Sequence, residues 1–207
     1  MKLAKRRPVL GFMLPGRGRR RAWQLDGTRV YLRPPRHGDY RAWSNLRDAS
    51  RNFLTPWEPR WPVESTGRAA FRRRLHAMAV EWRHDEGYGL FIFNNADDAL
   101  LGGVNLTHVR RGVAQTASLG YWIGEAYARQ GYMTDALRTL LPYAFHQLGL
   151  HRIEAACLRE NEASRRLLLK VGFHEEGAAR QYLRINDRWQ DHLLFGLVDN
   201  DLLAPAR

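Results

Sequence analysis

Cysteine and long apolar runs are scarce in this sequence. Cys157 is the single cysteine, which excludes an intrachain disulfide, and its apolar neighbours in segment 155–158 favour a buried, unreactive thiol. No segment approaches the roughly 20 consecutive apolar residues of a membrane helix. The apolar segment 9–14 is too short for the core of a signal peptide, so we expect a cytoplasmic protein.

The motifs of several cofactor-dependent enzymes are missing as well. The eight histidines show neither an HExxH-type pair nor Cys/His ligand spacing, so no metal site is predicted. Gly131 is followed by Tyr132 and Met133 rather than by Lys-Ser/Thr, which excludes a nucleotide P-loop. No dinucleotide-binding fingerprint occurs either.

Positive charge, by contrast, is abundant and unevenly placed. Residues 1–22 contain eight lysines and arginines and no acid, so they carry two thirds of the net charge of +12. We expect a basic, flexible tail over residues 1–22, followed by a single domain over residues 23–207. Two interpretations of the tail stay open: contact with RNA or the ribosome, or a solubilising extension without a partner.

The hydrophobic pattern predicts a mixed α/β domain. Apolar alternation and turn signals predict strands at residues 28–33, 88–93, 100–106, 116–123, 152–158, 178–185 and 189–198. Helical spacing predicts helices near residues 40–46, from about 65 to 87, from about 134 to 148, and at 162–171.

Two helix starts in this pattern are suited to ligand binding. The helix near Thr134 follows a strand and Gly131, and the free N–H groups and positive dipole end of a helix start bind phosphate groups. Gly131 lets the backbone approach a ligand closely, and Arg129 adds a cation. At the start of the next helix, Asn161 is the predicted N-cap and lies near Ser164, so that both side chains are able to hydrogen-bond a ligand.

Together these stretches resemble the GNAT superfamily of acetyltransferases. The strand–glycine–helix junction is similar to the family's pyrophosphate loop, and Asn161-x-x-Ser164 resembles its "N-x-x-S … G-F" segment, with Gly172-Phe173 at the end. Within the superfamily, the chain resembles the RimJ/RimL group, which acetylates N-terminal amines of ribosomal proteins. The resemblance covers about residues 28–198, and its most telling segments are 52–59, 119–124, 130–137 and 186–192.

The resemblance implies a GNAT-like fold, with a central, mostly antiparallel sheet splayed between its fourth and fifth strands and flanked by four helices. It implies acetyl-CoA as the cosubstrate, bound without a metal. The implied binding residues are Trp122 and Ile123, whose backbone pairs with pantetheine, then Arg129, Gln130, Gly131, Tyr132, Met133 and Thr134 of the loop, and Asn161 and Ser164. Ala128 and Met133 depart from the family's usual loop, which weakens the expected binding without removing it, because backbone N–H groups hold the phosphates.

The expected catalytic residues also come from the resemblance. Ser118 stands where many GNAT enzymes carry a carboxylate base. An α-amino group with a pKa of about 8 is about 10% neutral at pH 7, whereas a lysine is neutral below about 0.1%, so an N-terminal amine is the acceptor that needs a base least. Glu58 is the candidate to hold or deprotonate the amine, and Glu125 and Asp191 are weaker candidates. Ser164 is the candidate to hydrogen-bond the departing CoA thiolate.

The acceptor itself stays open at this point. A protein N-terminus, such as that of a ribosomal protein, is the preferred interpretation. A small-molecule amine is one alternative, and a ribosome- or nucleic-acid-binding protein with a vestigial acyltransferase domain is another. We expect a monomer or a homodimer, without membrane association.

Overall fold

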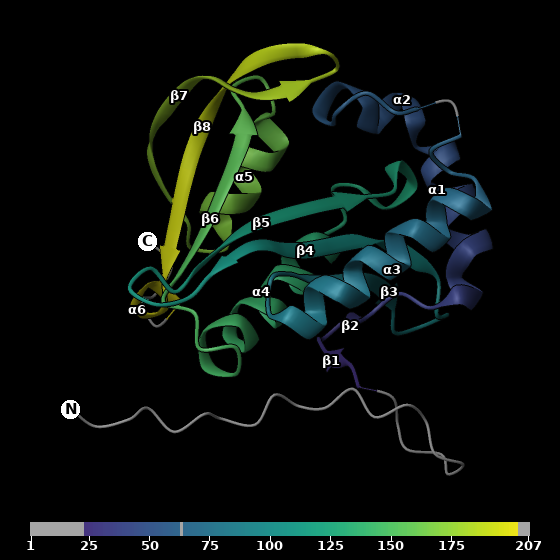
Figure 1. Ribbon diagram of the computed structural model, residues 1–207, viewed down its shortest axis with the longest axis horizontal. Coiled ribbons are helices and arrows are strands. Elements are labelled where there is room, and N and C mark those ends of the chain that lie inside the picture. Colours follow the sequence, from purple (N-terminus) through teal and green to yellow (C-terminus); the bar gives the residue numbers. More distant parts are fainter. Residues whose placement is uncertain (1–22, 63, 203–207) are drawn as a thin grey trace.

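The computed structural model describes residues 23–62 and 64–202, so the predicted basic tail, residues 1–22, lies outside the described part. Its centre is one eight-stranded sheet in the order β1-β2-β3-β4-β5-β6-β8-β7, with helices on both faces (Figure 1). The strands are β1 (Leu25–Asp26), β2 (Val30–Arg33), β3 (Tyr88–Asn94), β4 (Leu100–Arg110), β5 (Thr116–Ile123), β6 (Arg152–Leu158), β7 (His174–Ile185) and β8 (Arg188–Val198).

The helices include the four that the sequence predicts and two short additions. The predicted ones are α1 (Tyr40–Ala49), α3 (Arg68–His84), α4 (Tyr132–His146) and α5 (Glu162–Lys170). The additions are α2 (Arg51–Leu54) and α6 (Asp199–Leu202), which are single turns too short to show a hydrophobic period. No helix within residues 23–62 and 64–202 combines the length and the apolarity needed to cross a bilayer.

Two hydrophobic clusters hold helices against opposite faces of the sheet. On one face, α4 buries Met133, Ala136, Leu137, Leu140 and Leu141, whose spacing follows one side of a helix. The side of α5 that carries Leu168 packs into the same cluster. On the other face, Trp43 of α1 and Phe71 of α3 pack against β3 and β4, where they meet Phe91, Phe93 and Leu100.

The sheet opens between β5 and β6, the only parallel neighbours among the described strands. Their register runs from Thr116↔Arg152 to Ser118↔Glu154 and then stops, although both strands continue. Figure 1 shows the two strands diverging beyond this point. The predicted mixed α/β fold and the predicted splay are therefore confirmed. Of the strands within residues 23–62 and 64–202, only β4 pairs with the segment Leu119–Ile123.

Candidate active site

The loop between β5 and α4 has the backbone geometry of an anion-binding turn. After a short 3-10 helix, η3 (Glu125–Tyr127), Arg129 and Gly131 adopt positive φ angles of 60° and 86°. Gly131 is the N-cap of α4, and no side chain of the described residues caps that helix start. Alternation of left- and right-handed residues turns successive N–H groups toward one concave side, where an anion binds. The geometry fits the diphosphate that the sequence analysis assigns to it.

The predicted loop residues differ in what they offer a ligand. The side chain of Met133 is buried in the core with 6% exposure, so this residue offers a ligand at the start of α4 only its backbone N–H. Gln130 donates from Nε2 to the carbonyl oxygen of Ala126 at 2.7 Å, which braces the loop internally. Arg129 is exposed and Thr134 is half-buried. At Met133 the sequence departs from the family's usual loop, but this side chain packs in the core, so the departure removes no polar contact with a ligand.

Across the splay, Tyr121 of β5 reaches the start of α5. Its Oη lies 2.7 Å from Ser164 Oγ. The Ser164 backbone N–H donates to Asn161 Oδ1 at 3.1 Å, so Asn161 is the N-cap that the sequence predicts. This leaves the Asn161 Nδ2 group as a donor for a ligand. The sequence points to Tyr121 only as a member of segment 119–124, because its hydrogen-bond partner Ser164 is distant in the chain.

Burial sets the protonation state of the groups around Ser164. Burial raises the pKa of Tyr121 well above its ordinary value, and the hydrogen bond with Ser164 lowers it by less. Burial also raises the pKa of Cys157 to about 11. Both groups therefore keep their protons at neutral pH. Cys157 is buried with 5% exposure, as predicted.

Glu58 belongs to a compact cluster of charged and aromatic side chains. Arg47 of α1 donates from Nη1 to Glu58 Oε1 at 2.8 Å and from Nη2 to Oε2 at 2.6 Å. Trp61 Nε1 also donates to Oε2, at 2.7 Å. The guanidinium of Arg47 lies 3.9 Å from the ring centre of Trp61 and 4.8 Å from that of Trp122. A planar cation held by a carboxylate and two indoles has little freedom to reorient, so the Glu58 carboxylate is fixed in place.

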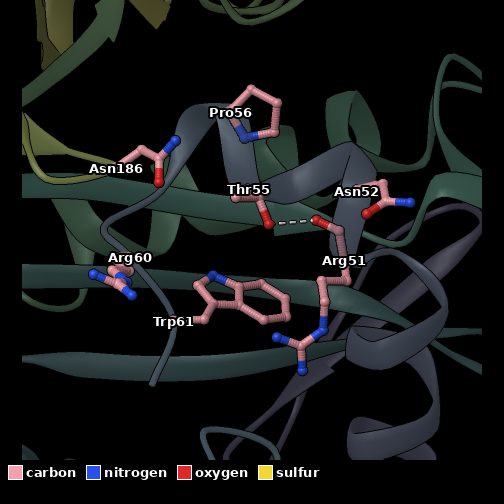
Figure 2. A pocket seen from close by; sticks show the side chains of 7 residues that line it. All are labelled: Arg51, Asn52, Thr55, Pro56, Arg60, Trp61 and Asn186. Carbon is pink, nitrogen blue, oxygen red and sulfur yellow. Dashed lines mark hydrogen bonds between the residues drawn. The ribbon is translucent and has the colours of Figure 1, made fainter. Parts of the chain in front are cut away.

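A cavity of about 560 Å³ lies beside this cluster (Figure 2). Figure 2 shows the Trp61 ring between Arg60 and Arg51, with Thr55 Oγ1 donating to the Arg51 carbonyl oxygen. Its lining residues are Arg51, Asn52, Thr55, Pro56, Arg60, Trp61 and Asn186. Asn186 comes from the β7–β8 turn, and its N–H donates to the carbonyl oxygen of Glu58 at 3.2 Å. The cavity is therefore open to solvent and lined by two segments that are far apart in the sequence.

The weaker candidates for an amine-binding carboxylate lie elsewhere. Glu125 is exposed at the start of η3, and Asp191 accepts the N–H of Gln181 at 2.9 Å within the β7–β8 hairpin. None of the three carboxylates is itself among the lining residues, but Glu58 is hydrogen-bonded to Trp61, which lines the cavity. Ser118, at the position of the missing base, pairs with Thr107 on one side and Glu154 on the other. Among the described residues, no group of three or more His, Cys, Asp and Glu side chains is arranged to hold a metal ion.

Comparison with known proteins identifies the family to which this site belongs. The acetyltransferase (GNAT) domain matches residues 29–174. The "Probable N-acetyltransferase YjcK" of Bacillus subtilis is 36% identical over 182 residues, which cover 86% of this chain and 98% of that protein. The [ribosomal protein uS5]-alanine N-acetyltransferase of Escherichia coli is 31% identical over 158 residues, covering 76% and 81%.

Solved structures agree with this match. Mycobacterium smegmatis RimJ in complex with CoA-disulfide superposes with a TM-score of 0.83 at 32% identity, covering 88% of this chain and 90% of that one. The family match, the relatives and the fold thus define an acyltransferase that takes its acyl group from an acyl-CoA thioester. The chain belongs to the GNAT family, as an acetyl-CoA-dependent N-acetyltransferase that resembles the RimJ/RimL group of ribosomal-protein N-acetyltransferases.

Proposed function

We propose that this enzyme acetylates the N-terminal α-amino group of a protein, with ribosomal proteins as the acceptor class. The observation that carries the proposal is the cavity of about 560 Å³ beside the fixed carboxylate of Glu58. Its polar and aromatic lining suits the first residues of an extended peptide. The relatives named for ribosomal-protein acetylation support the choice of acceptor class, and with such an acceptor we expect the reaction to take place in the cytoplasm.

The residues present fit acetyl-CoA on the opposite side of the site. The backbone of Arg129 to Thr134 would hold the diphosphate, and the unpaired edge of β5 at Trp122 and Ile123 would pair with the pantetheine amides. Asn161 Nδ2 would contribute a further donor. These are the groups that the sequence analysis assigns to the cosubstrate, and the φ angles of the loop and the short β5–β6 register support that assignment.

The chemistry is direct transfer. The neutral amine attacks the thioester carbonyl carbon, the carbon–sulfur bond breaks, the amine loses a proton, and the CoA thiolate gains one. Ser164 donates a hydrogen bond to the departing sulfur while it accepts one from Tyr121, which is protonated at neutral pH because burial raises its pKa. A hydroxyl backed by a second hydroxyl is a better donor than an isolated serine.

Glu58 binds the acceptor amine and holds it in position for attack. A carboxylate offers about four lone-pair positions, and Arg47 and Trp61 occupy three of those of Glu58. The remaining position accepts an N–H from the acceptor amine and orients its lone pair. Because an α-amine is about 10% neutral at pH 7, a positioned acceptor suffices where Ser118 replaces the usual base.

Mass spectrometry tests the acceptor class. The full chain is incubated with acetyl-CoA and three acceptors at pH 7: peptides with free N-termini taken from ribosomal proteins, the same peptides blocked at the N-terminus but containing lysine, and polyamines. We expect acetylation of the free N-termini at least about tenfold faster than of the others. Faster modification of lysine or of polyamines would replace the proposed acceptor.

A further inference from the structure

The turn between β1 and β2 is bound tightly to the start of α4. The carboxylate of Asp135, in the first turn of α4, accepts the backbone N–H groups of Arg29 at 2.7 Å, Val30 at 3.1 Å and Thr28 at 3.4 Å. Gly27 lies so close to α4 that a Cβ there would stand 2.5 Å from a side-chain oxygen of that helix. Two segments about a hundred residues apart in the chain therefore share one rigid junction.

The side chain of Arg29 extends from this junction onto the anion-binding loop. Its Nη1 donates to the carbonyl oxygen of Gln130 at 2.7 Å, and its guanidinium carbon lies 4.2 Å from the ring centre of Tyr132. The same Nη1 lies 3.5 Å from the position that a Cβ would take at Gly131. Arg29 thus touches three consecutive residues of the loop.

The loop needs such an external contact because its conformation is strained. Arg129 holds a φ of 60°, which costs a residue with a side chain roughly 1 kcal/mol. In a planar trans peptide, the C=O and the N–H point in opposite directions. A guanidinium that fixes the Gln130 carbonyl oxygen on one side therefore fixes the Gly131 N–H on the other side, where the proposed diphosphate would accept it.

We propose that Arg29 is a positioning residue for acetyl-CoA. It acts through the Gln130–Gly131 peptide, with Asp135 holding the backbone of Arg29 in place. The inference rests on the proposed role of the loop in binding the CoA diphosphate, and it is independent of the acceptor. Arg29 contacts neither the acceptor cavity nor the Ser164–Tyr121 pair, so its effect is confined to the affinity for the cosubstrate.

The test is Arg29→Met in the full chain, with Arg68→Met as the matched control. Arg68 also stacks over a tyrosine, with 4.7 Å to the ring of Tyr40, but it lies on α3 away from the loop. Calorimetry gives the Kd for CoA and for 3′-dephospho-CoA, and kinetics gives kcat and the two KM values. We expect Arg29→Met to weaken both CoA ligands about fivefold, because one exposed charge-assisted hydrogen bond is lost. The KM for the peptide, kcat and the control variant stay within about twofold.

Several outcomes would overturn the proposal. If Arg29→Met leaves the Kd for CoA unchanged, Arg29 does not position the loop. A loss seen with CoA but absent with 3′-dephospho-CoA makes Arg29 a direct contact of the 3′-phosphate. A loss that disappears at high salt identifies direct ion pairing with the diphosphate, since screening weakens an exposed ion pair more than a fixed loop geometry. A parallel rise in the peptide KM, with a large fall in Tm, indicates a general folding defect.

Two further variants keep the test decisive if Arg29→Met is unstable. Arg29→Lys retains a donor for the Gln130 carbonyl oxygen, so it should recover part of the lost affinity. Asp135→Asn replaces one acceptor oxygen by a donor that faces backbone N–H groups, so it should weaken CoA binding in the same direction. Full CoA affinity in both variants contradicts the proposal.

Discussion

The proposed acetyl-CoA side and the proposed acceptor side of this site are built from different parts of the chain. The acetyl-CoA side consists largely of backbone: the loop around Gly131, the unpaired edge of β5 and the start of α5. The acceptor side consists of side chains, with Arg47, Glu58 and Trp61 in mutual contact beside the cavity. A site made of backbone groups depends little on side-chain identity, which agrees with the departures at Ala128 and Met133, whereas a site made of side chains depends on each of its members.

The largest effect is expected on the backbone side, from Gly131→Asp. Aspartate at a φ of 86° is strained and places a negative charge where the diphosphate charge must lie. We expect CoA affinity to fall by about a hundredfold or more, as measured by calorimetry. Gly112→Asp is the matched control, because Gly112 also has a positive φ, 69°, and has open space around it. Equal losses in both variants would mean that strain alone weakens binding.

On the side-chain side, we expect Glu58→Gln to lower kcat/KM for the peptide by roughly ten- to a hundredfold. The amide loses the charge-assisted contact with the amine and the bidentate pairing with Arg47. CoA affinity should not change. Glu125→Gln and Asp191→Asn, which remove carboxylates away from the cavity, serve as controls.

The pH dependence of the activity lost in Glu58→Gln shows whether Glu58 holds the amine or acts as a general base. A holding role gives the same fold loss at pH 7 and pH 9, whereas a general base gives a larger loss at pH 7, where the amine is mostly protonated. Peptide acetylation at the two pH values, with saturating acetyl-CoA, distinguishes the two roles. A larger loss after Glu125→Gln than after Glu58→Gln would shift the amine site to η3.

A smaller effect is expected where the two sides meet, from Tyr121→Phe. This variant removes the hydrogen bond to Ser164, so kcat should fall about three- to tenfold with little change in either KM. Burial raises the pKa of Tyr121 above its ordinary value of 10.0, so the tyrosine keeps its proton from pH 6 to 9, and the fold loss should be constant over that range. Tyr143→Phe on α4 is a control, since burial also raises the pKa of that tyrosine. A loss that varies between pH 6 and 9 would contradict the assigned protonation state.

The smallest effect on catalysis is expected from deletion of residues 1–22, which lie outside the described residues. We propose that their charge contacts RNA or the ribosome, and eight basic residues make such contact steeply salt-dependent. Peptide acetylation should change by less than about twofold, while binding to ribosomal particles weakens and depends less on salt. Unaltered binding would favour the solubilising interpretation, and a collapse of catalysis would place the domain boundary before residue 22.

The sequence predicts the groups that act near their own positions in the chain, and it does not predict contacts between distant segments. Gly131 and Asn161 act within a few residues of their own positions, so local patterns reveal them. Arg29 and Asp135 are 106 positions apart, and no local pattern links them. Tyr121 and Ser164 are 43 positions apart, and the sequence analysis assigns a catalytic role only to Ser164.

Elements of the fold were missed for a related reason. The first residues of β7, His174 to Gly177, are all exposed, so apolar alternation gives no signal there and the strand is predicted to begin four residues late. β1 is two residues long and is defined by its pairing with β2, not by its own composition. Short or edge elements such as these depend on neighbours that the sequence does not place.

The register between β5 and β6 spans only three residue pairs, so the proposed binding of acetyl-CoA between these strands bears on the stability of the enzyme as well as on its catalysis. A ligand that pairs with the open edge of β5 and spans toward α5 joins the two halves of the sheet, and it binds only the folded chain. At a concentration of one hundred times its Kd, such a ligand adds about 2.7 kcal/mol to the free energy of unfolding. Cells rich in acetyl-CoA would therefore unfold and degrade less of this protein, and starved cells would lose it faster.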